Sequence, residues 1–319
     1  MIIATHSGKF HADDVWGVAV LDLVFPGCTL VRTRDPQKIR EADFAVDVGG
    51  IWDPQTGRFD HHQKGFEGAR QSGVIYASAG LVWKEHGARC VAKIAESHAG
   101  YQISAEQAQQ IASAIDGDLV QYLDMSDTGA ARNAPGGYGL SAVISGFNPT
   151  WIDEQEAGDA AAADALRLQQ FRRAMEFITD IVANAVKYRV GSMRAVEQVR
   201  QSERLEDGSL LFLKNGALPW ASIVRNEMPK VLFVISYHSD EQRYMIRTVP
   251  ATTDTFEARK DLPEAWAGLR DNELAAVTGV PDAVFCHNNL FIAAARSFEG
   301  IMKMARMALD ENIVTDTQA

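Results

Sequence analysis

Histidines and aspartates recur in three short segments near the start of the chain. His6, His11 and Asp13 lie within eight residues, Asp47 follows an apolar run, and residues 60–62 read Asp-His-His. Imidazole and carboxylate groups together suit Mn²⁺, Fe²⁺ or Zn²⁺, and several carboxylates without a thiolate favour Mn²⁺ at a phosphate-processing site. Because the chain holds only eight histidines, their concentration here indicates a metal site rather than structural hydrogen bonding.

The elements expected around these residues bring them to one edge of a sheet. Residues 2–5 form an apolar strand that ends before His6, and the apolar spacing over 12–25 predicts a helix. Residues 44–48 form another strand, and the glycine pair that follows lets the backbone turn away behind Asp47. Strands that alternate with helices predict a parallel sheet, and functional groups gather outside the carboxyl ends of such strands. We therefore expect these side chains in one crevice.

The pattern as a whole predicts an α/β protein of two domains joined by a long helix. The first domain, residues 1–150, should hold the parallel sheet and two further helices. One of these covers 75–86 and should stop at Gly87. The other covers 104–123, and Ser104 and Gln107 form the capping box that starts it.

An alanine-rich, charged segment without proline predicts one helix from about residue 153 to 189, which makes residues 151–190 the connector. Beyond it, residues 191–319 change to short apolar runs that are typical of strands, followed by a helix. This pattern predicts a smaller α+β domain. The runs cover 210–213, 231–237, 244–249 and 283–286, and the helix covers 297–309.

Six side chains could together hold two divalent ions: His6, His11, Asp13, Asp47, His61 and Asp127. Four positive charges would meet three carboxylates, which leaves a net charge of about +1 to attract a phosphate. Two such ions can activate water and stabilise an in-line displacement at phosphorus. Asp47, in the middle of the series, is the candidate bridging ligand. Asp124 and Asp127 both end a predicted helix, where a carboxylate opposes the helix dipole, so both are ligand candidates.

Composition limits the partners of the protein. The net charge of −11 argues against broad adhesion to nucleic acid or anionic membranes, which requires an extended basic surface. Three cysteines without a C-x-x-C pair fit neither a disulfide framework nor a thiolate zinc site. We expect a cytoplasmic protein without a membrane anchor, because no apolar run is long enough to span a bilayer. The sequence leaves open whether the protein forms homo-oligomers.

Several segments resemble the melanocyte-proliferating-gene exonuclease family, a branch of the DHH phosphoesterases. The segments that carry this resemblance are residues 5–14, 46–50, 58–62, 76–83, 216–220 and 259–270. The resemblance implies a DHH-type catalytic domain with two divalent metal ions on a parallel sheet. It also implies a second domain, here residues 191–319, that binds the substrate and closes over the site.

The resemblance also implies roles for single residues. It makes metal ligands of His6, His11, Asp13, Asp47, His61 and Asp127, with Asp127 preferred over Asp124. His62 would face the phosphate, with Asp60 orienting the histidines, so that His62, Asp60 and Asp47 form the catalytic group. The implied substrate contacts are Arg259, Lys260 and His287. Ala293 and Ala294 stand where the family usually has two glycines, and their methyl groups would crowd a phosphate held against that backbone.

The leading functional prediction is a Mn²⁺-dependent phosphodiesterase that removes nucleotides from RNA or single-stranded nucleic acid, with 3′ to 5′ polarity implied by the resemblance alone. One alternative keeps the site but takes pyrophosphate, a dinucleotide or another small phosphoester, which the acidic surface favours. Another is a metal- or nucleotide-binding regulatory protein that has lost turnover, an idea suggested by the two alanines.

Overall fold

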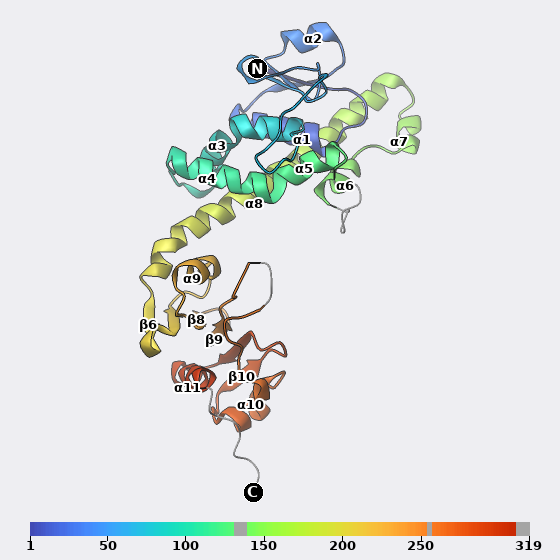
Figure 1. Ribbon diagram of the computed structural model, residues 1–319. Coiled ribbons are helices and arrows are strands. Elements are labelled where there is room, and N and C mark those ends of the chain that lie inside the picture. Colours follow the sequence, from blue (N-terminus) through green and yellow to red (C-terminus); the bar gives the residue numbers. More distant parts are fainter. Residues whose placement is uncertain (131–138, 254–256, 311–319) are drawn as a thin grey trace. The chain divides into compact units, whose positions relative to one another are not determined.

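The computed structural model describes residues 1–130, 139–253 and 257–310. The chain forms two compact units, Met1–Val190 and Gly191–Ala319, which are coloured blue to yellow-green and yellow to red in Figure 1. The fold is mixed α/β, as predicted, with one sheet in each unit.

The first unit contains the predicted parallel sheet. Its strands run in the order β2-β1-β3-β5-β4. Neighbouring strands are parallel except for β4, which pairs antiparallel with β5 at one edge. The two-residue strands β4 and β5 were not predicted, because two residues are too few to show an alternating pattern. The strands are β1 (Ile2–Thr5), β2 (Thr29–Arg32), β3 (Phe44–Val46), β4 (Trp52–Asp53) and β5 (Arg58–Phe59).

Helices bury the apolar residues of this sheet. Trp16 of α1 packs against Trp83 of α3, with ring centroids 5.7 Å apart, and both belong to one core with Phe59 of β5. The predicted capping box at Ser104 is confirmed at the start of α4. The first helices are α1 (Ala12–Val24), α2 (Pro36–Glu41), α3 (Ser78–Ala99) and α4 (Ala105–Ile115). They are followed by a short π-helix (Asp116–Val120), α5 (Gln121–Asp127), α6 (Leu140–Ser145) and α7 (Trp151–Glu156).

The prediction that a helix stops at Gly87 is wrong. Helix α3 passes through this position and ends at Gly100, which takes the left-handed conformation typical of a helix end. Gly87 serves packing instead, because a Cβ there would lie 2.9 Å from the indole ring of Trp83. The indole Nε1 donates to the carbonyl of Ala112 in α4 at 2.9 Å. Gly87 therefore lets the Trp83 ring lie against its own helix.

The long connecting helix differs from the prediction at both ends. Gly158 has a φ of +91° and separates α7 from α8 (Ala160–Arg200). Helix α8 then continues eleven residues beyond the predicted end at residue 189. Its buried face is part of the core of the first unit rather than a bare linker, through Phe171, Ile178, Val182, Val186 and Val190.

The second unit holds a six-stranded sheet in the order β10-β11-β9-β8-β7-β6, antiparallel except for the β7–β8 pair. One apolar core contains residues of α10 and α11, and another contains residues of α9 and Val199. The strands are β6 (Glu203–Leu205), β7 (Leu210–Leu213), β8 (Phe233–His238), β9 (Arg243–Thr248), β10 (Ala283–Cys286) and β11 (Ile292–Ala295). The helices are α9 (Ala221–Glu227), α10 (Asp271–Thr278) and α11 (Phe298–Leu309).

Ala293 and Ala294 lie in β11, between β10 and β9, and both are fully buried. Their methyl groups therefore occupy the packed middle of a sheet.

Single 3₁₀ turns lie at Pro54–Thr56, Glu206–Gly208 and Glu264–Trp266. In the described part of the chain, no helix is both long and apolar enough to cross a bilayer.

Alanine substitution separates the packing role of Gly87 from ordinary helix propensity. Gly87→Ala should lower the free energy of unfolding by roughly 1 to 2 kcal/mol, because the added methyl overpacks the Trp83 ring. Gly191→Ala in α8 is the matched control, since no atom lies within 4 Å of its added Cβ. It should stabilise by about 0.5 to 1 kcal/mol. Urea unfolding of both variants measures the difference, and equal effects would contradict the packing role.

Candidate metal centre

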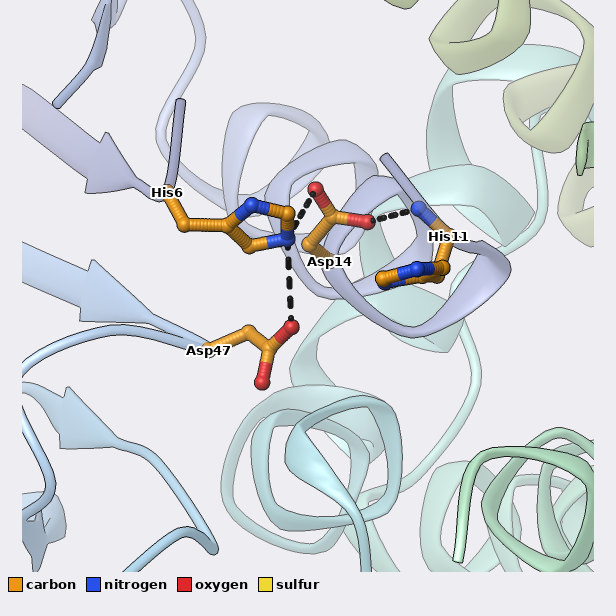
Figure 2. Close-up of side chains that lie close together, drawn as sticks. All are labelled: His6, His11, Asp14 and Asp47. Carbon is orange, nitrogen blue, oxygen red and sulfur yellow. Dashed lines mark hydrogen bonds and ion pairs between the residues drawn. The ribbon is translucent and has the colours of Figure 1, made fainter. Parts of the chain in front are cut away.

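His6 follows β1 and places its Nε2 atom between two carboxylates. This atom lies 3.2 Å from Oδ2 of Asp14 and 3.4 Å from Oδ2 of Asp47, as Figure 2 shows. All three residues are buried. Nε2 of His6 and Oδ2 of Asp14 have no hydrogen-bond partner among the described residues. Buried polar atoms that face one another without a hydrogen bond are what a divalent cation would satisfy.

His11 completes this first group from the start of α1. Its ring centroid lies 5.6 Å from that of His6, and its side chain is exposed. Its backbone N–H donates to Oδ1 of Asp14 at 2.7 Å, which forms the capping box of the helix. Ligand atoms from His6, His11, Asp14 and Asp47 all lie within 4.8 Å of one another. Asp14 was not predicted, although an acidic residue at the third helical position regularly turns back toward the cap.

Asp47 is the meeting point of the site. Its φ of +55° is left-handed, a conformation that is rare outside glycine and collects at functional sites. Its Oδ1 accepts from the hydroxyl of Ser78 at 3.3 Å and lies 3.3 Å from Nδ1 of His62 and 3.8 Å from Nδ1 of His61. Its other oxygen faces His6. One carboxylate thus touches both clusters of predicted residues.

The carboxylate of Asp60 connects His62 to the loop behind Asp47 through hydrogen bonds. Its Oδ1 accepts from the backbone N–H of His62 at 3.0 Å and lies 2.9 Å from the Nδ1 atom of that ring. Its Oδ2 accepts from the backbone N–H of Gly50 at 2.6 Å, in the loop behind Asp47. The buried carboxylate therefore fixes the orientation of His62, whose side chain is 62% exposed.

Asp13, His61 and Asp127 form a second group. Nε2 of His61 lies 3.2 Å from Asp127, and Nδ1 lies 3.9 Å from Asp13. The Asp13 carboxylate accepts the backbone N–H groups of Ser78 at 3.1 Å and Ala79 at 2.6 Å, at the start of α3. The hydroxyl of Ser78 lies 3.1 Å from Nδ1 of His61. Ser78 was missed as a site residue because no spacing rule connects one serine to a distant histidine.

Asp124 has a different environment from Asp127. Its Oδ2 lies 2.7 Å from a guanidinium nitrogen of Arg70, and its Oδ1 accepts from the backbone N–H of Gly80 at 3.0 Å. Burial raises the pKa of Asp124 to about 7 in spite of this partner. Among the described residues, the groups able to hold an ion include Asp127 but not Asp124.

The clustered charges shift one another's protonation. Burial lowers the pKa of His6, but the carboxylates of Asp14 and Asp47 outweigh burial and raise this pKa to about 10. Hydrogen bonding to Asp47, and then to Asp60, raises the pKa of His62 to about 9 against the effect of burial. Burial raises the pKa of Asp47, but His6 and His62 lower it overall. Without a metal, the protonated imidazoles of His6 and His62 therefore neutralise part of the negative charge of the neighbouring carboxylates.

The site lines a cleft of about 1180 Å³ within the first unit. Five of the described residues along its walls are aspartates, whereas Arg34, two residues after β2, is the one arginine or lysine among them. Tyr122 of α5 also lines the cleft, and 56% of its surface is exposed. An anionic substrate would therefore need bound cations before it could enter this acidic cleft.

The three predicted substrate contacts lie in the second unit. The guanidinium of Arg259 donates to backbone carbonyls at the end of α9, including those of Met228 and Arg225 at 2.8 and 2.7 Å. The Nζ atom of Lys260 donates to the carbonyl of Leu309 at the end of α11 at 2.7 Å. Both cations thus close helix ends. His287 is exposed, and its Nδ1 accepts from the backbone N–H of Asn289 at 3.0 Å.

Comparison with known proteins identifies relatives over nearly the whole chain. The model of the MYG1 exonuclease family, described as uncharacterised protein family UPF0160, matches residues 2–309. Human MYG1 exonuclease is 30% identical over 336 residues, which cover 96% of this chain and 85% of the human protein. A MYG1 protein of Schizosaccharomyces pombe is 30% identical over 325 residues, 97% of each chain.

A solved structure of RecJ from Thermus thermophilus, in complex with Mn²⁺, resembles the chain weakly, with a TM-score of 0.27 and 13% sequence identity. The match covers 97% of this chain and 52% of RecJ, so the chain spans about half the length of that protein.

The fold and the donor set define a class, the α/β proteins whose histidines and aspartates at the carboxyl edge of a parallel sheet suit divalent metal ions. Within this class the chain belongs to the MYG1 exonuclease family. This confirms the family that the sequence motifs resemble.

Metal binding should be coupled to proton release. Since the pKa of His6 is about 10, this imidazole carries a proton at neutral pH that a metal ion has to displace. Each fall of one pH unit should therefore weaken Mn²⁺ binding about tenfold per displaced proton. Calorimetric titration between about pH 6.5 and 8.5, in buffers of different ionisation enthalpy, measures both quantities. An affinity that is independent of pH would contradict this prediction.

The two candidate aspartates should behave differently when neutralised. Asp127→Asn should weaken Mn²⁺ binding and leave stability nearly unchanged. Asp124→Asn should retain metal binding but lower the free energy of unfolding by about 1 to 2 kcal/mol, because Arg70 loses one of its two carboxylate partners and keeps Asp116. Urea unfolding in EDTA together with Mn²⁺ titration tests the pair. The opposite result would make Asp124 the ligand.

Proposed function

We propose that the protein is a phosphodiesterase that removes nucleotides from the ends of RNA or short single-stranded nucleic acid, with two Mn²⁺ ions and 3′ to 5′ polarity. The chain is a member of an exonuclease family and hence a hydrolytic enzyme. The observation that carries the proposal is a pair of ligand groups beside one cleft, with Asp47 in the first group and 3.8 Å from His61 of the second. Shared carboxylates are typical of two-metal phosphoesterases.

In this proposal each group holds one ion. His6, His11 and Asp14 would hold the first ion, Asp13, His61 and Asp127 the second, and Asp47 would bridge the two. When bound, the ions would activate a water nucleophile and neutralise charge on the phosphate. Several carboxylates without a thiolate favour Mn²⁺.

The charge of the site favours a diester over pyrophosphate. With Asp14 included, four carboxylates balance the four positive charges of two ions, so the net charge expected at the ligands falls from about +1 to about zero. Asp60 and protonated His62 form a further neutral pair. A phosphodiester carries one negative charge per phosphate and suits this centre, whereas pyrophosphate carries several.

Two residues of the cleft suit a nucleotide. No ion pair joins the exposed Arg34 to a carboxylate within the described segments, so its charge is available for a phosphate. The exposed Tyr122 ring offers a face on which a base can stack. With Nδ1 turned to Asp60, His62 has its Nε2 atom available to donate a hydrogen bond to a phosphate oxygen.

Short substrates fit the protein better than long ones. With a net charge of −11, the chain has no excess of basic residues to form a long track for nucleic acid. Substrate contact by Arg259, Lys260 or His287 stays a prediction from the family resemblance. A cytoplasmic location also stays a prediction, and it agrees with the free thiols of Cys28, Cys90 and Cys286.

Activity on end-labelled oligonucleotides tests the function. With Mn²⁺, the protein should shorten 5′-labelled single-stranded RNA one nucleotide at a time. Asp47→Asn should reduce the rate by roughly a thousandfold or more, because it removes the bridging charge. His62→Gln should reduce it about 100-fold, because glutamine can donate a hydrogen bond but cannot transfer a proton as an acid. Asp240→Asn, which changes an exposed carboxylate of the second unit, should act like the unmodified protein.

The same assay separates the alternatives. A panel of pyrophosphate, dinucleotides, short RNA and longer RNA should be cleaved fastest at the short oligonucleotides. Turnover of pyrophosphate alone would replace the proposed substrate but keep the metal site. A protein that binds Mn²⁺ and cleaves nothing on the panel would contradict the enzymatic proposal. A label placed at the 3′ end would report cleavage of opposite polarity.

A further inference from the structure

The segment Ser7–Phe10 joins the two histidines of the first ligand group but has no regular secondary structure. Gly8 within it has a φ of +94°. No helix or strand hydrogen bonds therefore set the distance between His6 and His11. Metal ligands have to be placed to within a few tenths of an ångström, so side chains from elsewhere must hold this segment.

Asn148 supplies the first of these contacts. Its Oδ1 accepts from the backbone N–H of Phe10 at 3.0 Å, and its Nδ2 donates to the carbonyl of the same residue at 2.8 Å. Only an amide side chain presents a donor and an acceptor side by side in this way. Nδ2 also donates to the carbonyl of Ser145 at 3.2 Å, which fixes the amide to the end of α6. A residue 138 positions away thus holds the backbone next to His11.

Arg32 of β2 supplies the second contact. Its Nη2 donates to the carbonyl of Gly8 at 2.6 Å. Its guanidinium lies over two aromatic rings, 5.5 Å from the centroid of Phe10 and 4.9 Å from that of Phe171 in α8. These rings meet edge to face at 5.2 Å. In the described part of the chain no ion pair neutralises Arg32, so its contacts are directed at this segment and its aromatic neighbours.

We propose that Asn148 and Arg32 are positioning residues that hold the Ser7–Phe10 segment so that His6 and His11 bind one metal ion. The inference rests on the proposed metal site. Both side chains hydrogen-bond to the backbone between the two ligands, and among the described residues neither is hydrogen-bonded to an imidazole of the site. Residues that orient metal ligands typically contribute about 10- to 100-fold to metal affinity. A positioning residue that acts on one ligand group should change the affinity for one ion only.

Mn²⁺ titration of the metal-free chain tests this role. Asn148→Ala should weaken the ion at the His6–His11 group about 10- to 100-fold. It should leave the ion at the Asp13–His61–Asp127 group within roughly threefold. His11→Ala identifies which ion is affected, because it removes a ligand of the first group only. Asn215→Ala is the control, since that amide accepts a backbone N–H within the second unit.

Two milder variants keep the test valid if Asn148→Ala does not fold. Asn148→Asp retains the acceptor for the N–H of Phe10 but loses the donor to its carbonyl. Arg32→Lys retains the charge but loses the planar fork that reaches Gly8 and stacks on the rings. Both should weaken the same single ion by about tenfold. Melting temperatures in EDTA give the purely structural effect of each change.

The outcomes separate this inference from the proposed function. If both ions bind equally well in the variants, or if both weaken together as the metal-free melting temperature falls, the two residues are structural and the positioning role is overturned. In that case the proposed enzyme stands. If the unmodified chain binds no Mn²⁺, the metal site fails and the positioning role fails with it.

Discussion

The first turn of α3 is the structural element on which the site depends most. The backbone N–H groups of Ser78 and Ala79 donate to the carboxylate of Asp13, and that of Gly80 donates to the carboxylate of Asp124. A helix N-terminus is a favourable place for negative charge, because its N–H groups lack partners within the helix. Here two buried carboxylates that repel each other are held by one helix end.

The approach of Asp124 requires glycine at position 80. A Cβ atom there would overlap the carboxylate of Asp124. The same turn places the Ser78 hydroxyl between Asp47 and His61. Parallel strands bring the ligands to one edge of the sheet, and the helix end fixes their separation. The chemistry proposed for the cleft follows from this arrangement rather than from any one residue.

Repulsion between the clustered carboxylates is the main unfavourable contribution to the free energy of such a centre. Burial raises the pKa of Asp13 well above its usual value, and the charges of Asp47 and Asp127 raise it further. In the metal-free chain, protons on His6 and His62 compensate the carboxylates of Asp47, Asp14 and Asp60. A divalent cation can replace the proton on His6, which is why metal affinity and pH should be linked. The left-handed backbone of Asp47 adds local strain that its neighbours have to offset.

Local sequence patterns determined much of the architecture and the family. Strands β1 and β3 were readable as short apolar runs that end at polar residues, and α1 as a longer apolar segment that ends before Pro26 and Gly27. The family motifs placed eight histidines and aspartates in one site, and the structure brings those eight side chains to one cleft or its edge. What the pattern could not reveal depends on distant partners. Ser78, Asn148 and the ion pair of Asp124 with Arg70 acquire their roles through contacts between residues far apart in sequence.

The tertiary structure also determined the structural roles of residues whose type is compatible with more than one role. A glycine within a helix commonly signals its end, but Gly87 is required by the ring of Trp83 beside it. Arg259 and Lys260 matched a basic pair of the family, and the structure adds that both donate to backbone carbonyls at helix ends. Their contact with a substrate stays a prediction. The sequence by itself therefore indicated most of the groups that can bind a metal ion, with Asp14 as the exception, because residue type and spacing are local properties. Only the tertiary structure decided which carboxylate faces which imidazole, because that depends on distances across the fold.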